Sequence, residues 1–231
     1  MDDNLHEEIK TLISSLGGSF SGFSRIEEYL PLQLKQYPYA ITFGIRLSDA
    51  IIDEIEDKPT FTYFNHYRSV NALIDQIALR TVLLLCQKGH RAYSIAASQS
   101  IPAAPVPFSG VIPHKTGAVQ SGLGWIGKNG LFIHKEYGPR LRLGTVLTDL
   151  ALPCENELLQ SRCSACNKCV RACPALALTG NEWHMGDERE QVVDAKACSE
   201  YMNRHFKHIG RGSVCGICVK VCTAGLAGNK G

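Results

Sequence analysis

Apolar side chains recur at helical spacing in two stretches of the first half of the chain. From Leu5 to Leu16 they repeat every three or four positions, and Gly17-Gly18 ends the pattern, so an amphipathic helix is predicted there. A longer stretch from Val70 to Gln87 repeats in the same way, and Gly89 follows it as a glycine commonly follows a helix. Cys86, inside this second helix, is expected to be a small buried residue. The side of the helix expected to face the core carries Leu73, Ile77, Leu84 and Leu85.

Shorter apolar stretches indicate strands and one further helix. The further helix is expected over residues 115–122, and the long helix is expected to begin at His66-Tyr67-Arg68. The expected strands cover residues 39–45, 91–97, 131–134 and 143–148. Strands mixed with helices in this way predict an α+β fold with a mixed α/β core. We therefore predict one domain over residues 1–154 and a smaller, cysteine-rich domain over residues 155–231.

The composition is that of an ordinary globular protein, with 45% apolar residues. No apolar run approaches the ~20 residues that a membrane helix needs, and the N-terminus lacks the basic start and apolar centre of a signal peptide. We therefore expect a cytoplasmic protein with no membrane contact. The charge is uneven: residues 1–62 carry 11 acidic and 5 basic side chains, whereas residues 63–231 carry 11 acidic and 19 basic ones. Such cationic clustering permits a nucleic-acid surface but is weak evidence for one.

Eight of the ten cysteines lie between Cys163 and Cys222, and their spacing is the most specific signal in the chain. The first run has the spacing C-x2-C-x2-C-x3-C-P of bacterial ferredoxins, which bind [4Fe–4S] cubanes. The second run is Cys198 followed by C-x2-C-x3-C. Because the fourth cysteine of each run turns to the other cluster in such proteins, two ligand sets are predicted. The first cluster is assigned to Cys163, Cys166, Cys169 and Cys222, and the second cluster to Cys173, Cys198, Cys215 and Cys218.

Two other uses of these cysteines fit less well. A disulfide framework needs an oxidising compartment, for which the N-terminus gives no signal. Zinc sites use separated pairs of cysteines or mixtures of cysteine and histidine, unlike the continuous first run. The prediction is therefore an iron–sulfur protein that transfers single electrons.

The segment Gly122-Leu-Gly-Trp-Ile-Gly-Lys-Asn-Gly130 is the second most informative part of the chain. It nearly matches the phosphate-binding loop G-x4-G-K-[S/T]. However, Asn129 occupies the position of the hydroxyl that binds Mg2+, and the preceding residues are expected to be helical rather than a strand. Two other interpretations remain, namely a glycine-rich turn set by backbone geometry and a backbone that lies close against a large flat ligand.

Three segments before the cysteine runs carry a family resemblance. Gly122-Leu-Gly-Trp-Ile-Gly-Lys-Asn129, Tyr137-Gly-Pro-Arg-Leu-Arg-Leu-Gly144 and Thr148-Asp-Leu150 occur in this order. The order resembles the epoxyqueuosine reductases and the wider set that includes the reductive dehalogenases, and the resemblance covers residues 39–222. It implies a nitroreductase-like core that binds base-off cobalamin beside a ferredoxin-like module with two [4Fe–4S] clusters. It also implies that electrons pass from the distal cluster to the proximal one and on to cobalt, whose Co(I) form performs the reduction.

The resemblance also suggests which side chains hold the corrinoid. Lys128 and Asn129 are expected at its amides or phosphate tail, and a helix cap is the alternative for Asn129. Arg140 and Arg142 alternate on an extended segment and are expected to point the same way, toward phosphate or amide groups or toward solvent. The predicted cofactor-binding residues are Gly122, Gly124, Trp125, Gly127, Lys128, Asn129, Tyr137, Arg140 and Arg142.

Three side chains are candidates for donating a proton during reduction. His114 and Lys115 precede the glycine segment, where the resemblance places an acid. A protonated histidine can donate because it titrates near neutral pH, and a bond to a backbone carbonyl is the alternative role. Tyr67 would need activation, because a phenol has a pKa of about 10, and half-buried packing is its alternative.

Two departures separate the chain from the epoxyqueuosine reductases. Those enzymes carry an aspartate, a proposed proton donor, shortly before the glycine segment, and the corresponding position here is Phe108. The helical repeats that help to grip tRNA in that family have no counterpart after Cys222, so tRNA is not the expected substrate.

Two functions of different classes follow, with RNA binding through the basic half as a third. The first is a cobalamin-dependent iron–sulfur oxidoreductase of a small substrate, which receives low-potential electrons from a ferredoxin or flavodoxin through the second cluster. The second is a di-cluster electron-transfer protein, or a reductive activator of another corrinoid protein, without a substrate of its own. The first function requires a bound corrinoid and a proton donor, whereas the second requires an open face over one cluster.

Overall fold

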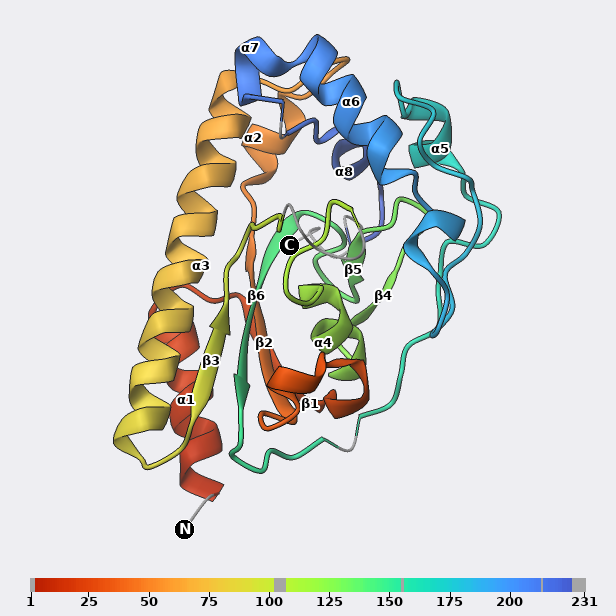
Figure 1. Ribbon diagram of the computed structural model, residues 1–231. Coiled ribbons are helices and arrows are strands. Elements are labelled where there is room, and N and C mark those ends of the chain that lie inside the picture. The colour runs from red at the N-terminus through yellow and green to blue at the C-terminus, as the bar shows by residue number, and fades with distance from the viewer. Residues whose placement is uncertain (1–2, 102–106, 155, 213, 226–231) are drawn as a thin grey trace. The chain divides into compact units, whose positions relative to one another are not determined.

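The computed structural model describes residues 3–101, 107–154, 156–212 and 214–225 (Figure 1). They form two compact units, neither of which is continuous in sequence. The first unit consists of the residues up to 46 together with 70–123 and 141–158, and the second consists of 47–69, 124–140 and the residues from 159 onward. The predicted boundary between residues 154 and 155 stays a prediction, and Glu155 itself lies outside the described residues.

An antiparallel sheet of four strands, in the order β1-β2-β6-β3, forms the centre of the first unit (Figure 1). The strands are β1 (Phe20–Arg25), β2 (Tyr39–Arg46), β3 (Ala92–Ile95) and β6 (Leu141–Thr148). β2 and β6 pair in register from Tyr39↔Thr148 to Arg46↔Leu141. The strands predicted at 39–45, 91–97 and 143–148 are confirmed with small shifts of their ends, as is the mixed α+β class.

Helices cover both faces of this sheet. α1 (Asp3–Ser15) and the part of α3 (Phe61–Gln87) after residue 69 lie on one side, and α4 (His114–Gln120) lies on the other (Figure 1). A Cβ atom on Gly117 of α4 would lie 2.3 Å from the Thr42 hydroxyl oxygen, so only glycine lets α4 approach β2 this closely. Because both faces are covered, β2 is buried at every position from Ala40 to Ile45, which explains why its apolar residues alternate only in part.

A cluster of buried apolar residues fills the space between the sheet and short connecting turns. Two of these turns are the 3-10 helices Glu27–Tyr29 and Leu32–Leu34. Another 3-10 helix, Arg189–Gln191, belongs to the second unit and is not part of this cluster. The cluster joins the first two turns to the strands and to the segment before α4. It comprises Ile26, Leu30, Leu34, Ala40, Ile95, Ile112 and Leu147.

α3 differs from its prediction in its start and in its buried side. It begins at Phe61 rather than at His66, because the Thr60 hydroxyl accepts the N–H of Tyr63 (3.0 Å) and caps the helix. Leu73 is 39% exposed and Cys86 is also exposed, so their predicted burial was wrong. Leu73 lies about 100° around the helix from the buried Ile74. The buried stripe comprises Val70, Ile74, Ile77, Ala78, Thr81 and Leu85.

The end of α3 follows the prediction. Gly89 has a φ of +88°, and the N–H of His90 bonds the carbonyl of Leu85 (2.9 Å), which is a common way for a helix to end at glycine. By length and composition α3 is also apolar enough to cross a membrane, and 33% of its most apolar window is buried inside the protein. The expected absence of membrane contact therefore stays a prediction.

The described residues of the second unit form a two-stranded hairpin and five α-helices besides the first turns of α3. The hairpin pairs β4 (Gly124–Ile126) with β5 (Phe132–His134). β5 was predicted, but β4 was not, because its glycine-rich sequence indicated only a turn. The helices are α2 (Asp49–Asp53), α5 (Lys168–Ala172), α6 (Ala195–His205), α7 (Lys207–Gly210) and α8 (Ile217–Lys220).

Candidate functional site

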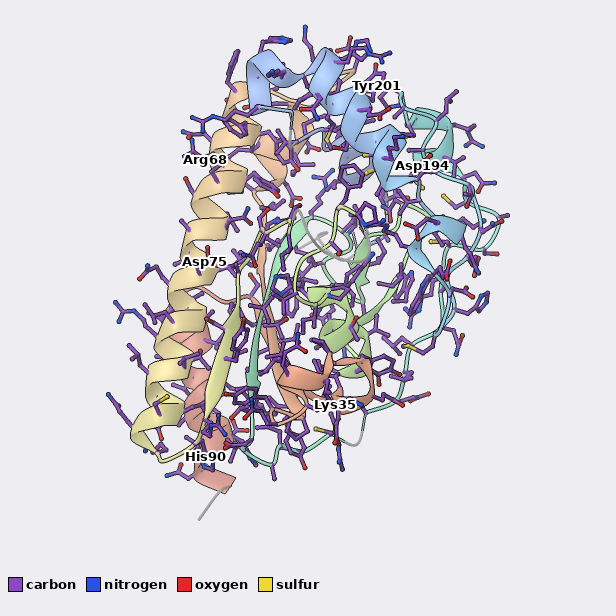
Figure 2. All side chains as sticks on the ribbon, viewed as in Figure 1. Lys35, Arg68, Asp75, His90, Asp194 and Tyr201 are labelled. Carbon is purple, nitrogen blue, oxygen red and sulfur yellow. The ribbon has the colours of Figure 1, made fainter. Side chains whose placement is uncertain are left out.

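Short helices of the second unit place the cysteines. Cys163 and Cys166 lie in a loop closed by the bond from the N–H of Cys166 to the carbonyl of Cys163 (2.9 Å). Cys198 lies in the first turn of α6, whose start is fixed because the Asp194 carboxylate accepts the N–H of Ala197 (2.9 Å). Figure 2 shows Asp194 at this end of α6. The local sequence therefore orients Cys198 through an ordinary helix cap.

The last three cysteines surround α8, which begins at an unusual glycine. Gly216 has a φ of +82°, and a Cβ atom there would lie 2.7 Å from Ile55 and 2.8 Å from Tyr63. Only glycine fits this position. It holds α8 and its Cys218 against the neighbouring part of the second unit.

The thiols of the first predicted ligand set lie close enough to affect one another's charge. Burial raises the pKa of the Cys169 thiol, and Cys222 and Cys163 raise it further. Burial also raises the pKa of Cys222, with contributions from Cys163 and Cys166. Cys222, from the second run, therefore lies near cysteines of the first run, and their joint ligation of one cluster stays a prediction.

The second predicted set is grouped in the same way. Burial raises the pKa of Cys215 to about 11, and Cys198 and Cys173 add to the effect. Burial raises the pKa of Cys218 further, and its neighbours Cys215, Cys198 and Cys173 all contribute. Cys169 of the first set also affects Cys218, so the two sets are neighbours.

The described residues contain no group of side chains placed to hold a single metal ion. Among the described residues, no three His, Cys, Asp or Glu side chains converge as the ligands of one mononuclear ion would. A cubane needs a wider arrangement, because each thiolate binds a different iron at a corner of the cube. The assignment of the thiols to two quartets, each drawn from both runs, stays a prediction.

Lys128 bonds the first cysteine loop, and its predicted contact with a corrinoid stays a prediction. Its ammonium donates to the carbonyl of Ser164 (2.6 Å) and to Oδ1 of Asn167 (3.3 Å), and the side chain is only 8% exposed. Ser164 has a φ of +46°, a left-handed conformation that is strained for a residue with a Cβ. Lys128 therefore supports a strained loop that carries cluster ligands.

Asn129 is bonded within the second unit as well. Its Oδ1 accepts the N–H of Leu131 (3.1 Å), which stabilises the hairpin turn, and its Nδ2 lies 3.5 Å from the carbonyl of Cys218. The alternative role as a helix cap was wrong, because no helix begins there. Together, Lys128 and Asn129 reach the backbone of both cysteine runs.

At each glycine predicted to face a cofactor, another part of the chain lies so close that a Cβ atom would clash with it. A Cβ atom on Gly124 would lie 2.0 Å from the carbonyl oxygen of Ile133, and one on Gly127 would lie 2.9 Å from Oδ1 of Asn129. Gly122 has a φ of +66°, and a Cβ atom there would lie 2.8 Å from the carbonyl oxygen of Glu157. Backbone geometry thus accounts for these glycines, and their contact with a cofactor stays a prediction.

Trp125 offers a polar group that the described residues leave unsatisfied. Its side chain is buried, with 5% exposed, and its indole Nε1 has no hydrogen-bond partner among the residues described. The guanidinium of Arg162, which precedes Cys163, lies over the ring at 5.4 Å. A buried donor of this kind normally has an acceptor.

Arg140 is the centre of an ion-pair network in the second unit. Its two terminal nitrogens each lie 2.9 Å from a carboxylate, one of Asp49 and one of Asp53. Lys220 of α8 donates to Asp53 as well (2.9 Å). The guanidinium is nearly fully buried, and its Nε has no hydrogen-bond partner among the described residues. The network joins α8 to α2.

Arg142 belongs to the first unit and has different partners. Its Nε donates to Oδ1 of Asn71 (2.9 Å), and a terminal nitrogen donates to the carbonyl of Ala97 (3.2 Å). Asp75, labelled on α3 in Figure 2, accepts the N–H of Ala97 (2.8 Å). The end of β3 is therefore held from both α3 and β6.

His114 completes this network rather than presenting a proton. One ring nitrogen lies 3.0 Å from the carbonyl of Ala96 and the other 2.9 Å from the Thr145 hydroxyl. Since a carbonyl only accepts, Nε2 carries the hydrogen and Nδ1 accepts from Thr145. Burial lowers the pKa of His114 to about 4, so the ring is neutral at pH 7. This geometry favours the alternative role, bonding to a backbone carbonyl.

The remaining predicted residues lie in three different settings. Lys115 follows His114 in the first turn of α4, half-buried. Tyr67 is half-buried, and its ring packs edge-on against Tyr63 with centroids 6.4 Å apart, as its alternative role predicted. Tyr137 stacks on His134 at 4.8 Å, and its N–H donates to Nδ1 of that ring (3.3 Å).

Phe108 occupies the position at which the resemblance places an acid. It is 47% exposed and has a φ of +57°, which is a strained conformation for a bulky residue. A phenylalanine has no proton to give, so a donor must come from another position.

Several residues of these networks were not predicted. Asp49 and Asp53 stand four apart on α2, a spacing that places two carboxylates on one side of a helix, and this signal was available in the sequence. Nothing in the sequence links them to Arg140, because 87 or more positions separate the partners. The bond from Lys128 to the cysteine loop and the bonds of Arg142 and Asp75 near the end of β3 also join residues far apart in sequence, so the sequence alone does not reveal them.

Comparison with known proteins connects the motifs to an established group. The 4Fe-4S double cluster binding domain family matches residues 162–225. An epoxyqueuosine reductase of Gloeobacter violaceus is 39% identical over 93 residues, covering 40% of this chain and 26% of that protein. A tetrachloroethene reductive dehalogenase of Desulfitobacterium hafniense is 35% identical over 121 residues, covering 46% of this chain and 21% of that protein. The chain thus spans only about a quarter of the length of these relatives.

The fold is also found in a solved structure. A reductive dehalogenase whose structure suggests a mechanism for B12-dependent dehalogenation matches with a TM-score of 0.73. The match covers 94% of this chain and 31% of the dehalogenase, at 22% identity. At this identity the likeness is one of fold.

Proposed function

Because the chain is a relative of the epoxyqueuosine reductases and reductive dehalogenases and carries a double [4Fe–4S] cluster domain, we propose that it is a cobalamin-dependent iron–sulfur reductase. In this function, low-potential electrons pass through the two clusters to a corrinoid cobalt and reduce a small substrate. A ferredoxin or flavodoxin is the proposed donor, in the cytoplasm, and the core is of the nitroreductase-like type.

One observation carries the proposal. The glycine segment that bears the resemblance sends Lys128 and Asn129 to the backbone of the two cysteine runs. The segment is therefore part of the cluster site and not a separate nucleotide loop. A chain that only stored clusters in a ferredoxin-like module would have no evident use for this segment.

Two buried hydrogen-bond donors of the second unit, which have no partner among the described residues, also support a bound corrinoid. Trp125 Nε1 and Arg140 Nε are buried without partners among the described residues, and both residues belong to the predicted cofactor-binding set. The side-chain amides of a corrinoid carry carbonyl acceptors that such donors would bond. When bound, the corrinoid would supply a cobalt that accepts single electrons and delivers them to the substrate. The chain's own part is to bind and orient it.

The proton for the product would come from Lys115 or Tyr67 rather than from His114. His114 is neutral at pH 7, and both of its ring nitrogens are engaged. A lysine ammonium carries a proton at neutral pH, so Lys115 is the first candidate to replace.

The test is anaerobic reconstitution with iron, sulfide and hydroxocobalamin, followed by desalting and quantification of iron and cobalt. Roughly eight irons and one cobalt per chain, with a base-off spectrum, would support the proposal. Trp125→Phe keeps the ring and removes only the donor, so we expect it to weaken cobalamin retention about tenfold with the iron content unchanged. Eight irons without cobalt in the wild-type chain would contradict the corrinoid function.

A di-cluster electron-transfer protein, or an activator of another corrinoid protein, is the second candidate. It is favoured by the bonds of Arg142 to Asn71 and Ala97, which engage a residue predicted to bind a cofactor. Phe108 in place of an acid also favours it. This candidate predicts eight irons, no retained cobalt and reversible reduction of both clusters without any added substrate.

A further inference from the structure

One ligand of the predicted clusters reaches the surface. Of the eight ligand cysteines, all of which are described, Cys166 alone is exposed and the other seven are half-buried. The first set, which contains Cys166, is therefore nearer to solvent than the second set.

Exposed basic side chains lie around this ligand. Arg162 immediately precedes Cys163, whereas Lys168 and Arg171 are three residues apart on α5 and so share one side of that helix. The ammonium of Lys168 lies 3.5 Å from the hydroxyl of Thr223, the residue after Cys222. Lys168 is thus placed at the first set, near both its exposed ligand and the ligand from the second run.

The positive charge of this segment has no acidic neighbours in sequence. From Leu159 to Asn181 the chain contains three basic residues after Gln160 and Ser161 and no Asp or Glu. Buried Lys128 adds a fourth cation, bonded to the carbonyl of Ser164. A partner that approaches Cys166 therefore meets a positive field.

We propose that this face, formed by Cys166 with Arg162, Lys168 and Arg171, docks a small acidic one-electron carrier protein, whose electron enters the first cluster. The inference rests on the proposed function and names the place where its electron donor binds. It replaces the expectation that electrons arrive at the second cluster, none of whose four predicted ligands is exposed. In the transfer the reduced carrier loses one electron and the first cluster gains it, and no bond is made or broken.

The composition of the face favours an acidic protein over a nucleic acid. Proteins that bind single strands add aromatic side chains on which bases stack, and no Phe, Tyr, Trp or His occurs from Arg162 to Glu182. A few basic residues around an exposed redox ligand are what brief electrostatic docking requires, because such charges raise the association rate more than the affinity.

The experiment uses the cluster-loaded chain and a reduced clostridial-type ferredoxin as the acidic carrier, mixed anaerobically in a stopped-flow instrument. The second-order rate of cluster reduction should fall as ionic strength rises, because salt screens the attraction. Lys168→Glu combined with Arg171→Glu should lower this rate at low salt at least about tenfold and remove most of its salt dependence.

A matched control keeps the change in net charge but moves it elsewhere. Arg204→Glu with Lys207→Glu alters two exposed basic residues of the same unit, also three apart, at the junction of α6 and α7. Figure 1 shows this junction at the end of α6 away from α5. The control should keep the wild-type rate within about twofold. The cationic methyl viologen radical should reduce the Lys168/Arg171 variant at least as fast as the wild type, which shows that its clusters are intact.

Three outcomes would overturn the inference. One is a wild-type rate that does not depend on salt, and another is an equal loss in both double variants. The third is a Lys168/Arg171 variant that loses binding to a single-stranded RNA while ferredoxin still reduces it at the wild-type rate. Failure of the proposed function is a separate result, because it appears beforehand as a chain without iron or without cobalt.

Discussion

At the scale of single residues, the site depends on side chains that fix backbone rather than on side chains that face a substrate. Lys128 bonds the carbonyl of Ser164, and His114 bonds the carbonyl of Ala96. Both are polar groups in largely buried positions, where an unmade bond costs more than an exposed one. Such residues are expected to tune the clusters and the stability of the units, and two predictions follow at this scale.

Replacing Lys128 should make the first cluster harder to reduce. A buried cation beside an anionic cluster stabilises its reduced, more negative state, so Lys128→Met should shift the midpoint potential of that cluster by roughly 60 mV to more negative values, a tenfold change for one electron. A redox titration followed by electron paramagnetic resonance measures this. Lys128→Arg keeps the charge and should recover most of the shift. If Met and Arg behave alike, the effect comes from packing and not from charge.

His114 should make the first unit less stable in mild acid. Its pKa is about 4 in the folded protein and 6.5 when unperturbed, so the unfolded state binds more protons between these values. Stability is therefore unaffected by His114 above pH 6.5 and falls as the pH is lowered toward 4. Between pH 7 and pH 5 this amounts to about 2 kcal/mol, or roughly 30-fold in an opening equilibrium. Hydrogen exchange of residues 92–97, corrected for the intrinsic rate, should show it.

His114→Gln is the control for this pH dependence. Glutamine keeps a donor for the Ala96 carbonyl and an oxygen for the Thr145 hydroxyl but does not titrate. Its exchange should change little between the two pH values. An equal acceleration in the variant would assign the pH dependence to another group.

At the scale of elements, α8 is the most heavily constrained part of the second unit. It carries Cys218 and is followed by Cys222, so it supplies both predicted clusters. Gly216 fits its start between Ile55 and Tyr63, and Lys220 bonds Asp53 on α2. The Arg140 network therefore determines how firmly the ligands around α8 are held.

Replacing Arg140, which bonds both carboxylates of this network, should reduce the stability of the folded protein more than replacing Lys220, which bonds only Asp53. Arg140→Met leaves Asp49 and Asp53 without their shared cation, and because both carboxylates are partly exposed the loss is expected to be about 2 kcal/mol, below the range for fully buried pairs. Lys220→Met breaks a more exposed pair and should cost at most about 1 kcal/mol. The urea concentration at which the cluster absorbance disappears ranks the two. Equal midpoints would contradict the order.

Acid should weaken the same network. Hydrogen bonds from Lys220 and Arg140 hold the pKa of the Asp53 carboxyl below its usual 3.8. A lowered folded pKa adds stability that is complete above the unfolded value and is lost as the pH falls below about 4. The gain is small, since Asp53 is 54% exposed on its side chain.

At the scale of the whole molecule, each predicted cluster takes ligands from both cysteine runs, yet we expect that either cluster can be removed without the other. Each predicted set takes three cysteines from one run and one from the other. Cys222→Ser should therefore remove the first cluster and Cys198→Ser the second, each leaving roughly four of eight irons. In the Cys198→Ser variant the first cluster remains, and Lys128→Met should still shift its midpoint potential. In the Cys222→Ser variant only the second cluster remains, and Lys128→Met should leave its potential unchanged. Loss of all iron in both variants would show that neither cluster forms alone.

The sequence predicted the parts of this molecule whose signals are local. The cysteine runs, the helix before Gly17 and the long helix ended by Gly89 all depend on spacing within a few residues, and the structure has them. β4 was missed because its glycines serve a close approach to Ile133, which only pairing with β5 reveals. Leu73 was misplaced because apolar spacing alone does not fix which side of a helix meets the sheet.

The role of the glycine segment shows the same limit at the site. Its sequence pointed to a large ligand or to a turn, and the resemblance pointed to corrinoid contacts for Lys128 and Asn129. Both side chains bond residues more than 35 positions away, and no pattern within the segment identifies such partners. The double [4Fe–4S] cluster domain could be predicted because iron–sulfur ligation follows a spacing rule, whereas buried ion pairs such as that of Arg140 follow none.

The exchange of ligands between the two runs has a consequence for how the protein is made. A ribosome releases Cys163, Cys166, Cys169 and Cys173 together, well before Cys198 and Cys222. During that interval the four early thiols form a set that could hold one cubane in a non-native arrangement, because four nearby cysteines are all that a cluster requires. The native pairing becomes available only after residue 222 has left the ribosome. The predicted first cluster therefore cannot assemble on its own ligands until synthesis has passed α8 and Cys222 has emerged.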